Sequence, residues 1–216
     1  MQDTSIGRLL LVLAGLASPA CVVPANQSGS VTAQGDGLPG SVVFPGHTAT
    51  VDCYCVPNLI AIPGRLVAIA EARILNCDDS AAKTITSKAS DDGGRSWQPE
   101  VAIVQNSSFT NAGGAVWDNH SNALLVTYAT NGPCAACPWS TCQPPACDCD
   151  SGCRNIWLVR STDKGRSFSK GRNISEAIWN HPRTCSGGSK CVYGEFINPG
   201  PTKGVQLMDG TLVFVV

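Results

Sequence analysis

A short turn sequence occurs twice in this chain of 216 residues, and it constrains the fold more than any other feature. Both copies follow a strand-like segment and fit the pattern S-x-D-x-G-x-S-aromatic. An aspartate in such a turn can accept hydrogen bonds from backbone N–H groups further along the chain, and a glycine supplies a positive φ. We therefore expect these aspartates to hold turns rather than to act in catalysis, with the aromatic ring folded beneath each turn. The positions are Ser90, Asp92, Gly94 and Trp97 in the first copy, and Ser161, Asp163, Gly165 and Phe168 in the second.

A turn repeated in this way indicates radially arranged four-stranded sheets, which is the architecture of a β-propeller. From residue 48 onward, short apolar runs alternate with clusters of Gly, Pro, Asn and Asp, and no sustained helical period accompanies them. The sequence therefore predicts an all-β domain over residues 48–216. The clearest strand candidates are 66–70, 101–104, 123–128, 156–159 and 212–216.

The N-terminal residues have the pattern of a secretory signal peptide. Arg8 precedes an apolar run over residues 9–16, and the small residues Ser18 and Ala20 follow it. This order of basic, apolar and small residues predicts a signal peptide over residues 1–20, although a buried N-terminal strand or helix remains the alternative. Residues 21–47 are rich in Gly, Ser, Pro and Ala and are interpreted as a flexible lead-in. We therefore expect a secreted or lumenal protein.

The 12 cysteines fit an exported chain, because disulfides persist in oxidising compartments. Six of them fall between Cys134 and Cys153, in a segment that contains prolines and no histidine. A disulfide-stapled loop over residues 133–153 is therefore preferred to a zinc site. Four Asn-x-Ser sequons also favour a secreted glycoprotein: Asn26, Asn106, Asn119 and Asn173.

The charge composition excludes some partners. The formal net charge is −1, and the 15 lysines and arginines are spread along the chain. This distribution argues against binding to nucleic acid or to an anionic membrane surface. No cofactor and no metal ion are expected.

The octad S-x-D-x-G-x-S-aromatic is the Asp-box, and further motifs resemble those of the sialidase (neuraminidase) family. The segment 54–57 (Tyr-Cys-Val-Pro) resembles the family's aromatic-Arg-Ile-Pro motif, and 64–73 resembles its G-x-L-hydrophobic-A-x-x-E-x-R strand. Residues 193–201 and 204–207 resemble its PGPGxGIQ stretch. The resemblance extends from about residue 50 to the end. It implies a six-bladed propeller, of which this chain covers roughly the first half, and hydrolysis of terminal sialic acid from glycoconjugates.

The resemblance also implies roles for individual residues. Asp79 matches the catalytic acid/base and Glu71 the carboxylate that orients the first substrate-binding arginine. Arg73 falls at a pocket wall, and Asp78 is the local alternative to Asp79 as acid/base. Asp79 could instead be a turn residue that caps the strand. Sialidases retain the anomeric configuration and use a tyrosine nucleophile in place of a carboxylate.

The main departure from the family is Cys55, which stands where the first arginine is expected. A thiol cannot bind a carboxylate through a charged fork, so Glu71 is expected to lack its partner. Cys53 and Cys55 are too close along a strand to pair easily, and Cys77 is a candidate partner for either.

The resemblance places the other catalytic residues beyond residue 216, so no turnover is expected from this chain alone. They are two arginines, the nucleophilic tyrosine and its glutamate. Tyr54, Tyr128 and Tyr193 are interpreted as packing residues.

Three functions remain open at this point. The first is an exo-α-sialidase that acts on sialylated glycoproteins, glycolipids or oligosaccharides. The second is an inactive sialidase-like protein that binds sialic acid, which Cys55 favours. The third is an Asp-box propeller that serves as an interaction scaffold.

Overall fold

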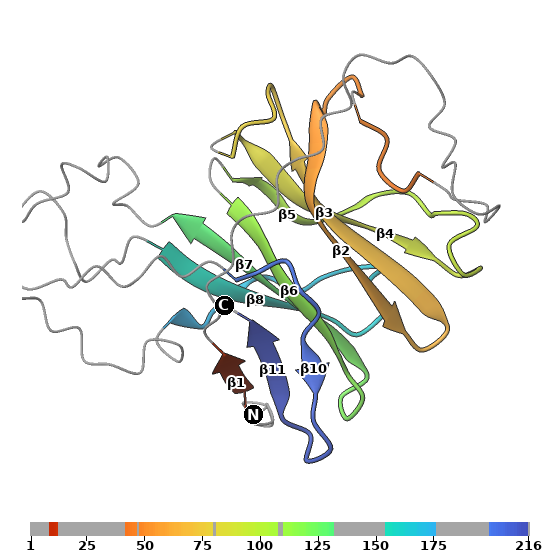
Figure 1. The fold of residues 1–216 in the computed structure, drawn as a ribbon, viewed down its shortest axis with the longest axis vertical. Coiled ribbons are helices and arrows are strands. Elements are labelled where there is room, and N and C mark those ends of the chain that lie inside the picture. The colour runs from red at the N-terminus through yellow and green to blue at the C-terminus, as the bar shows by residue number, and fades with distance from the viewer. Residues whose placement is uncertain are drawn as a thin grey trace, which may run out of the picture.

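The computed structural model describes residues 9–12, 42–46, 48–79, 81–107, 110–131, 154–175 and 199–215. These residues form eleven strands in three sheets (Figure 1). The first sheet contains β2 (Cys53–Ile62), β3 (Arg65–Arg73), β4 (Lys83–Ser90) and β5 (Val101–Ser107). The second contains β6 (Thr110–Asp118), β7 (Ala123–Asn131), β8 (Arg154–Ser161) and β9 (Arg172–Asn173). The third has the order β1 (Leu9–Val12), β11 (Leu212–Val215), β10 (Val205–Gln206).

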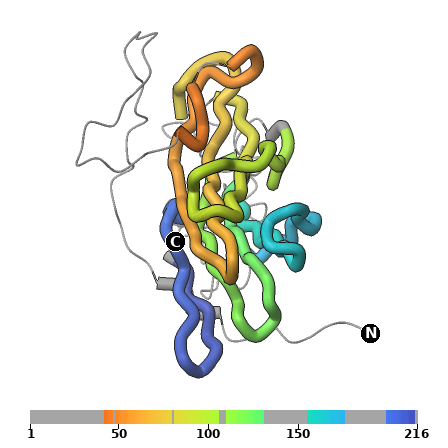
Figure 2. Tube along the Cα trace, turned by 90° about the vertical axis from the view of Figure 1, so that its right-hand side faces the viewer, coloured from red at the N-terminus to blue at the C-terminus, as the bar shows by residue number. Residues whose placement is uncertain are grey.

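The first two sheets are antiparallel meanders in which each strand pairs with the next along the chain. Their first strands lie side by side, and residues 199–206 run along both of them (Figures 1 and 2). Ala115 of β6 forms an isolated parallel bridge with Lys203. The amide of Asn58 in β2 donates to the carbonyl of Thr202 at 3.1 Å. The sheets are therefore successive blades around inner strands, and the predicted all-β, partial propeller is confirmed.

Glycine is required where residues 199–204 approach β6. A Cβ on Gly113 would lie 2.5 Å from the carbonyl oxygen of Thr127 and 2.6 Å from Cβ of Pro199. Neither neighbour can move without displacing backbone, so only a residue without a side chain fits at this position.

Two apolar cores fill the spaces between the blades. The first joins Val67, Ile69 and Ile85 of the first sheet to Leu124 and Val126 of β7. The second core packs the other face of the second sheet against the third. It includes Val116, Leu125, Ile156, Leu158, Leu212 and Phe214. Successive residues of β7 thus enter opposite cores, as a strand buried on both faces requires.

Both Asp-box turns have the predicted geometry. Gly94 and Gly165 have positive φ angles of 90° and 82°. The amide of each donates to the hydroxyl of the serine that opens the turn, at 2.7 Å in both copies. Asp92 accepts from the amide of Ser96 at 2.9 Å, and Asp163 accepts from the amide of Ser167 at the same distance. The structural role predicted for these aspartates is confirmed.

The aromatic residues of the turns are half-buried. Phe168 packs against the first core, and the ring of Trp97 lies 3.7 Å from the point that a Cβ on Gly94 would occupy. The second turn also contacts the first blade, because Arg65 donates to the carbonyl of Lys164 at 3.2 Å and the Lys164 ammonium donates to the carbonyl of Pro63 at 3.0 Å. The second turn therefore joins the two blades as well as closing its hairpin.

Several N-terminal predictions fall only partly on described residues. Within the predicted signal peptide, Leu9–Val12 form β1, parallel to β11. Within the predicted lead-in, the ring of Phe44 stacks on Tyr54 at 4.9 Å. The cysteine-rich loop 133–153 and Tyr193 lie outside the described residues. No helix in the described part of the chain has the length and apolar character needed to cross a membrane.

The Asp-box network makes acid stability testable at Asp163. Partial burial alone would raise the pKa of Asp163, but hydrogen bonds from Ser167, Ser161 and two backbone amides lower it to about 2. Asp163→Asn should lower the free energy of unfolding at pH 7 by about 1–2 kcal/mol, because the variant loses charge-assisted acceptors. A depressed folded-state pKa stabilises the protein above the unfolded-state value of about 4 and ceases to do so as the pH falls toward 2.

Urea denaturation between pH 2 and pH 7 checks this prediction. The difference between the wild type and Asp163→Asn should shrink as the pH falls from about 4 to about 2. Thr162→Ala, an exposed substitution in the same turn, serves as the control. A difference that stays constant over this range would contradict the role of the ionised carboxylate.

Candidate active site

Charged side chains gather at one end of the first two blades. Glu71 and Arg73 lie at the end of β3, and Lys83 begins β4. Asp79 lies in the connection between these strands, and Asn111 lies near the start of β6. Because β3 ends where β4 and β6 begin, the fold brings these five residues together. We call them the charge cluster.

Glu71 is the centre of the charge cluster and is only 1% exposed. Its Oε2 accepts from Nη2 of Arg73 at 2.8 Å and from Nζ of Lys83 at 3.2 Å. Its Oε1 accepts from the backbone amide of Ala112 in the second blade, at 2.9 Å. Glu71 lacks the arginine that the family motif would place at position 55, but two other cations of the same blade contact it.

Arg73 connects Glu71 to the proposed acid/base. Its guanidinium is 3% exposed and donates through Nη1 to the carbonyl of Cys77 at 2.7 Å. Through Nη2 it also forms an ion pair with the carboxylate of Asp79. The Asp79 side chain, in contrast, is 71% exposed. The cluster therefore presents one carboxylate to solvent and holds it with a buried arginine.

Asp78 does not have the same environment. Its backbone forms part of a tight turn, in which its amide donates to the side chain of Asn76 at 2.9 Å and its carbonyl accepts from Ala81 at 3.0 Å. Asp78 is exposed. Of the two adjacent aspartates, Asp79 is the one that the structure pairs with Arg73.

Sequence reasoning missed two residues of the charge cluster, Asn111 and Lys83, and the charged one is Lys83. Its side chain is completely buried, and Nζ donates to the backbone carbonyl of Asp79 at 2.7 Å and to Oδ1 of Asn111 at 3.0 Å. Burial lowers the pKa of Lys83, although Glu71 opposes this shift. The sequence carried a signal for the burial of Lys83. Side chains alternate along a strand, so Lys83 lies on the same face as the apolar Ile85, which is buried.

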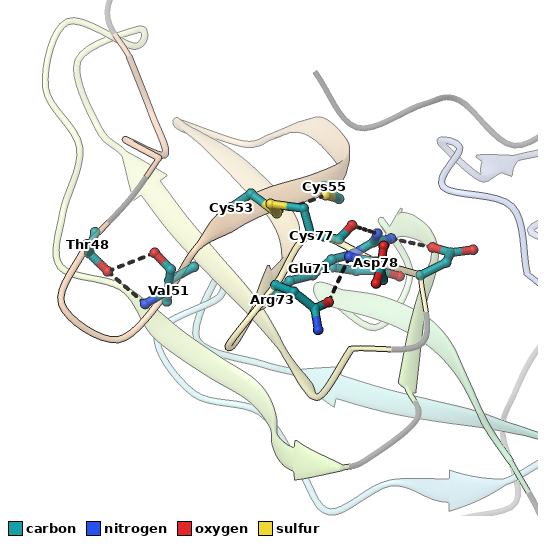
Figure 3. The surroundings of a disulfide bond; sticks show 10 residues. Thr48, Val51, Cys53, Cys55, Glu71, Arg73, Cys77 and Asp78 are labelled. Carbon is teal, nitrogen blue, oxygen red and sulfur yellow. Dashed lines mark hydrogen bonds and ion pairs between the residues drawn. A yellow bond between two sulfur atoms is a disulfide. The ribbon is translucent and has the colours of Figure 1, made fainter. Parts of the chain in front are cut away.

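Cys55 lies beside this cluster, at the position expected for the arginine. It is directly opposite Glu71 in the register of β2 and β3 and is 1% exposed. Cys53 forms a disulfide with Cys77, which confirms Cys77 as a partner for one of the two strand cysteines (Figure 3). Cys55 is also disulfide-bonded, and its Sγ lies 3.7 Å from Sγ of Cys53. Sulfur therefore occupies the space next to Glu71.

The backbone at this position is irregular. The pairing of β2 with β3 shifts between Cys55 and Asn58, and Val56 has a φ of 53°. A β-branched residue with positive φ is strained by about 1–3 kcal/mol. This strain coincides with the place where the family motif and the present sequence differ.

Two of the three tyrosines are packing residues, as predicted. Tyr54 stacks on Phe44 and donates its hydroxyl to Glu100 at 2.8 Å. Burial and Glu100 raise the pKa of Tyr54. Tyr128 is buried and stacks on Trp157. Burial raises its pKa too. A raised pKa disfavours the phenolate form of both tyrosines.

An open groove of about 490 Å³ lies at the opposite end of the inner strands. Its lining includes Ile60, Pro63, Trp117 and Lys203, and it contains no member of the charge cluster. Among the described residues, no three metal-ligating side chains come together. We take the charge cluster as the candidate active site, because it brings Asp79 together with Glu71 and Arg73.

The fold and its turns define an Asp-box β-propeller with a buried charge cluster at one end of its inner strands. Residues 56–216 match the model of the BNR repeat-like domain family. The chain belongs to this family.

Solved structures with a similar fold include sialidases. The chain is similar to the Hadza microbial sialidase Hz136, with a TM-score of 0.54 and 22% identity over 74% of this chain and 31% of that one. It is similar to the NanB sialidase from Streptococcus pneumoniae, with a TM-score of 0.55 and 13% identity over 82% and 43%. It is also similar to the Trypanosoma rangeli sialidase, with a TM-score of 0.53 and 17% identity over 80% and 29%. The chain thus spans less than half the length of these structures.

The disulfide between Cys53 and Cys77 should contribute measurably to stability. It closes a segment with a sequence separation of 24, and a loop of this length stabilises a fold by about 3 kcal/mol. Replacing both cysteines by alanine should lower the free energy of unfolding by about this amount. Urea denaturation with and without reductant measures the effect. If the double alanine variant lost no more stability than Lys88→Met, a substitution elsewhere in the same blade, the predicted contribution of the disulfide would be contradicted.

The burial of Lys83 predicts a pH dependence with a definite sign. Because its pKa is lowered in the folded state, unfolding takes up a proton between that value and about 10.5. The free energy of unfolding of the wild type should therefore rise with pH in this interval, relative to that of Lys83→Met. Denaturation series at several pH values below 10.5 measure the difference, with Lys88→Met on the same strand as the control. A difference that falls with pH would contradict this sign.

Proposed function

We propose that this chain contributes the acid/base part of an exo-α-sialidase active site, with Asp79 as the acid/base. One observation carries the proposal: Asp79 is the exposed carboxylate at the end of a buried network of Arg73, Glu71 and Lys83. A general acid must reach both its substrate and water, and it must be held in position. The likeness of the fold to solved sialidases supports the same reading.

In this reaction, Asp79 in its acid form gives a proton to the glycosidic oxygen as the aglycone leaves. As the aglycone leaves, the anomeric carbon bonds to the nucleophile. Water then displaces the nucleophile from that carbon while the Asp79 carboxylate takes a proton from the water, and the two displacements together retain the configuration. The family resemblance assigns the nucleophile to a tyrosine. Tyr54 is unsuitable for this role. Side chains alternate along a strand, so Tyr54 lies on the face of β2 opposite to that of its neighbour Cys55, and its hydroxyl donates to Glu100. Sialylated glycoproteins, glycolipids or oligosaccharides are the proposed substrates, met in a secreted or lumenal compartment.

A second candidate function is binding of sialic acid without hydrolysis. The observation that favours it is Cys55, which is buried, disulfide-bonded and unable to hold a substrate carboxylate. Arg73 does not replace the expected arginine, because its guanidinium already donates to Glu71, Asp79 and the carbonyl of Cys77. Loss of one charge-assisted pair typically costs about 2–5 kcal/mol of binding or transition-state stabilisation, so hydrolysis would suffer from the absence of the arginine.

Hydrolysis of a fluorogenic sialoside by the complete protein tests the proposal. Asp79→Asn should lower kcat about a hundredfold or more, because an amide neither gives nor takes the proton. Asp52→Asn, which removes another carboxylate from the start of the same blade, should leave the rate unchanged. A larger loss in Asp78→Asn than in Asp79→Asn would transfer the acid/base role to Asp78.

Binding assays separate the two candidates. If the wild type does not hydrolyse the sialoside but binds sialyllactose, the second function replaces the first. The 216-residue chain by itself should not turn over the substrate, and measurable hydrolysis by it would contradict the expected position of the nucleophile.

A further inference from the structure

We propose that Lys83 supplies Glu71 with the positive charge that the family motif would place at position 55, and that it positions the loop carrying Asp79. This inference rests on the proposed function only for its catalytic consequence. The relocation of the charge is a statement about the fold and can be tested separately.

The first argument is the arrangement around Glu71. Position 55 lies directly opposite Glu71 across the β2–β3 pairing, so a long cationic side chain there would reach the Glu71 carboxylate. In this chain the position holds a buried sulfur. The ammonium of Lys83, on the strand at the other side of β3, makes the contact at 3.2 Å. A cation from β4 thus stands in for a cation from β2.

The second argument is the balance of charge. A carboxylate that is 1% exposed requires nearby cations and hydrogen-bond donors, since an unpaired buried charge is strongly destabilising. With Lys83 present, the two carboxylates Glu71 and Asp79 face the two cations Arg73 and Lys83. Without Lys83, Arg73 alone would have to serve both carboxylates. An additional arginine at position 55 would instead leave one cation in excess.

The third argument concerns the loop between β3 and β4. Lys83 binds the backbone carbonyl of Asp79 at 2.7 Å, while Arg73 binds the Asp79 carboxylate. Lys83 also binds Asn111 of the second blade at 3.0 Å. The loop is therefore fixed at its backbone by Lys83 and at its side chain by Arg73. Lys83 is a positioning residue, since its completely buried ammonium cannot meet a substrate.

A double-mutant cycle tests the relocation. Cys55→Arg is compared with Cys55→Ala in the wild-type background and in the Lys83→Met background, so that loss of the Cys55 sulfur cancels. With Lys83 present, Cys55→Arg should be the less stable of the two. In the Lys83→Met background, the order should reverse, with a coupling of about tenfold or more in the folding equilibrium constant. Coupling below about twofold would overturn the inference.

Kinetics of the complete protein test the positioning role. Lys83→Met should lower kcat about tenfold or more and leave KM within about twofold. The substitution displaces Asp79, the proposed general acid, but leaves the residues that contact the substrate in place. Adding Cys55→Arg to Lys83→Met should restore part of kcat, whereas Cys55→Ala should not. Lys88→Met, on the same strand, should behave as the wild type.

The two proposals fail in different ways. A wild type without turnover contradicts the proposed function, and the stability cycle then still decides the role of Lys83. An active wild type whose Lys83→Met variant keeps the full kcat contradicts the positioning role alone. If Cys55→Arg does not fold in either background, the inference is overturned, because position 55 then cannot exchange its charge with position 83.

Discussion

The burial of the Glu71 carboxylate determines the arrangement of the whole candidate site. A carboxylate removed from water needs cations and hydrogen-bond donors, and an unpaired one costs several kcal/mol. Glu71 receives these from its own strand through Arg73, from β4 through Lys83 and from the second blade through the amide of Ala112. The requirement therefore fixes the positions of three strands relative to one another. The same requirement places the loop that carries Asp79, because Arg73 and Lys83 also bind that loop.

The cysteines of the site replace one kind of constraint by another. An arginine at position 55 would have tied β2 to Glu71 electrostatically. Here the disulfide between Cys53 and Cys77 joins the start of β2 directly to the segment that leads to Asp79 (Figure 3). The carbonyl of Cys77 also accepts from Arg73. A covalent link can thus hold the geometry of the loop without a charge at position 55, but it cannot bind an anionic substrate.

Local features of this protein could be predicted from its sequence, whereas contacts between blades could not. The Asp-box turns depend on hydrogen bonds over four residues, so the pattern around Asp92 and Asp163 was sufficient. The pairing of Lys83 with Asn111 spans 28 residues and two sheets, and no local pattern specifies it. The same limit applies to Glu71: from the sequence, only the opposite position on β2 was considered as the source of its partner, and Lys83 was not anticipated. A lysine that shares a strand face with buried Ile85 was the available signal.

The division between buried and exposed charge gives the site its chemical character. Glu71, Arg73 and Lys83 are almost completely inaccessible, so water neither screens nor replaces their interactions. Asp79 is the member of the cluster that remains in solvent, where its carboxylate can exchange a proton with water or a substrate. A buried network holds its geometry but cannot exchange ligands, while an exposed loop residue can react but has little fixed geometry of its own. Linking Asp79 to the network through Arg73 at its side chain and Lys83 at its backbone combines the two properties, and a general acid needs both.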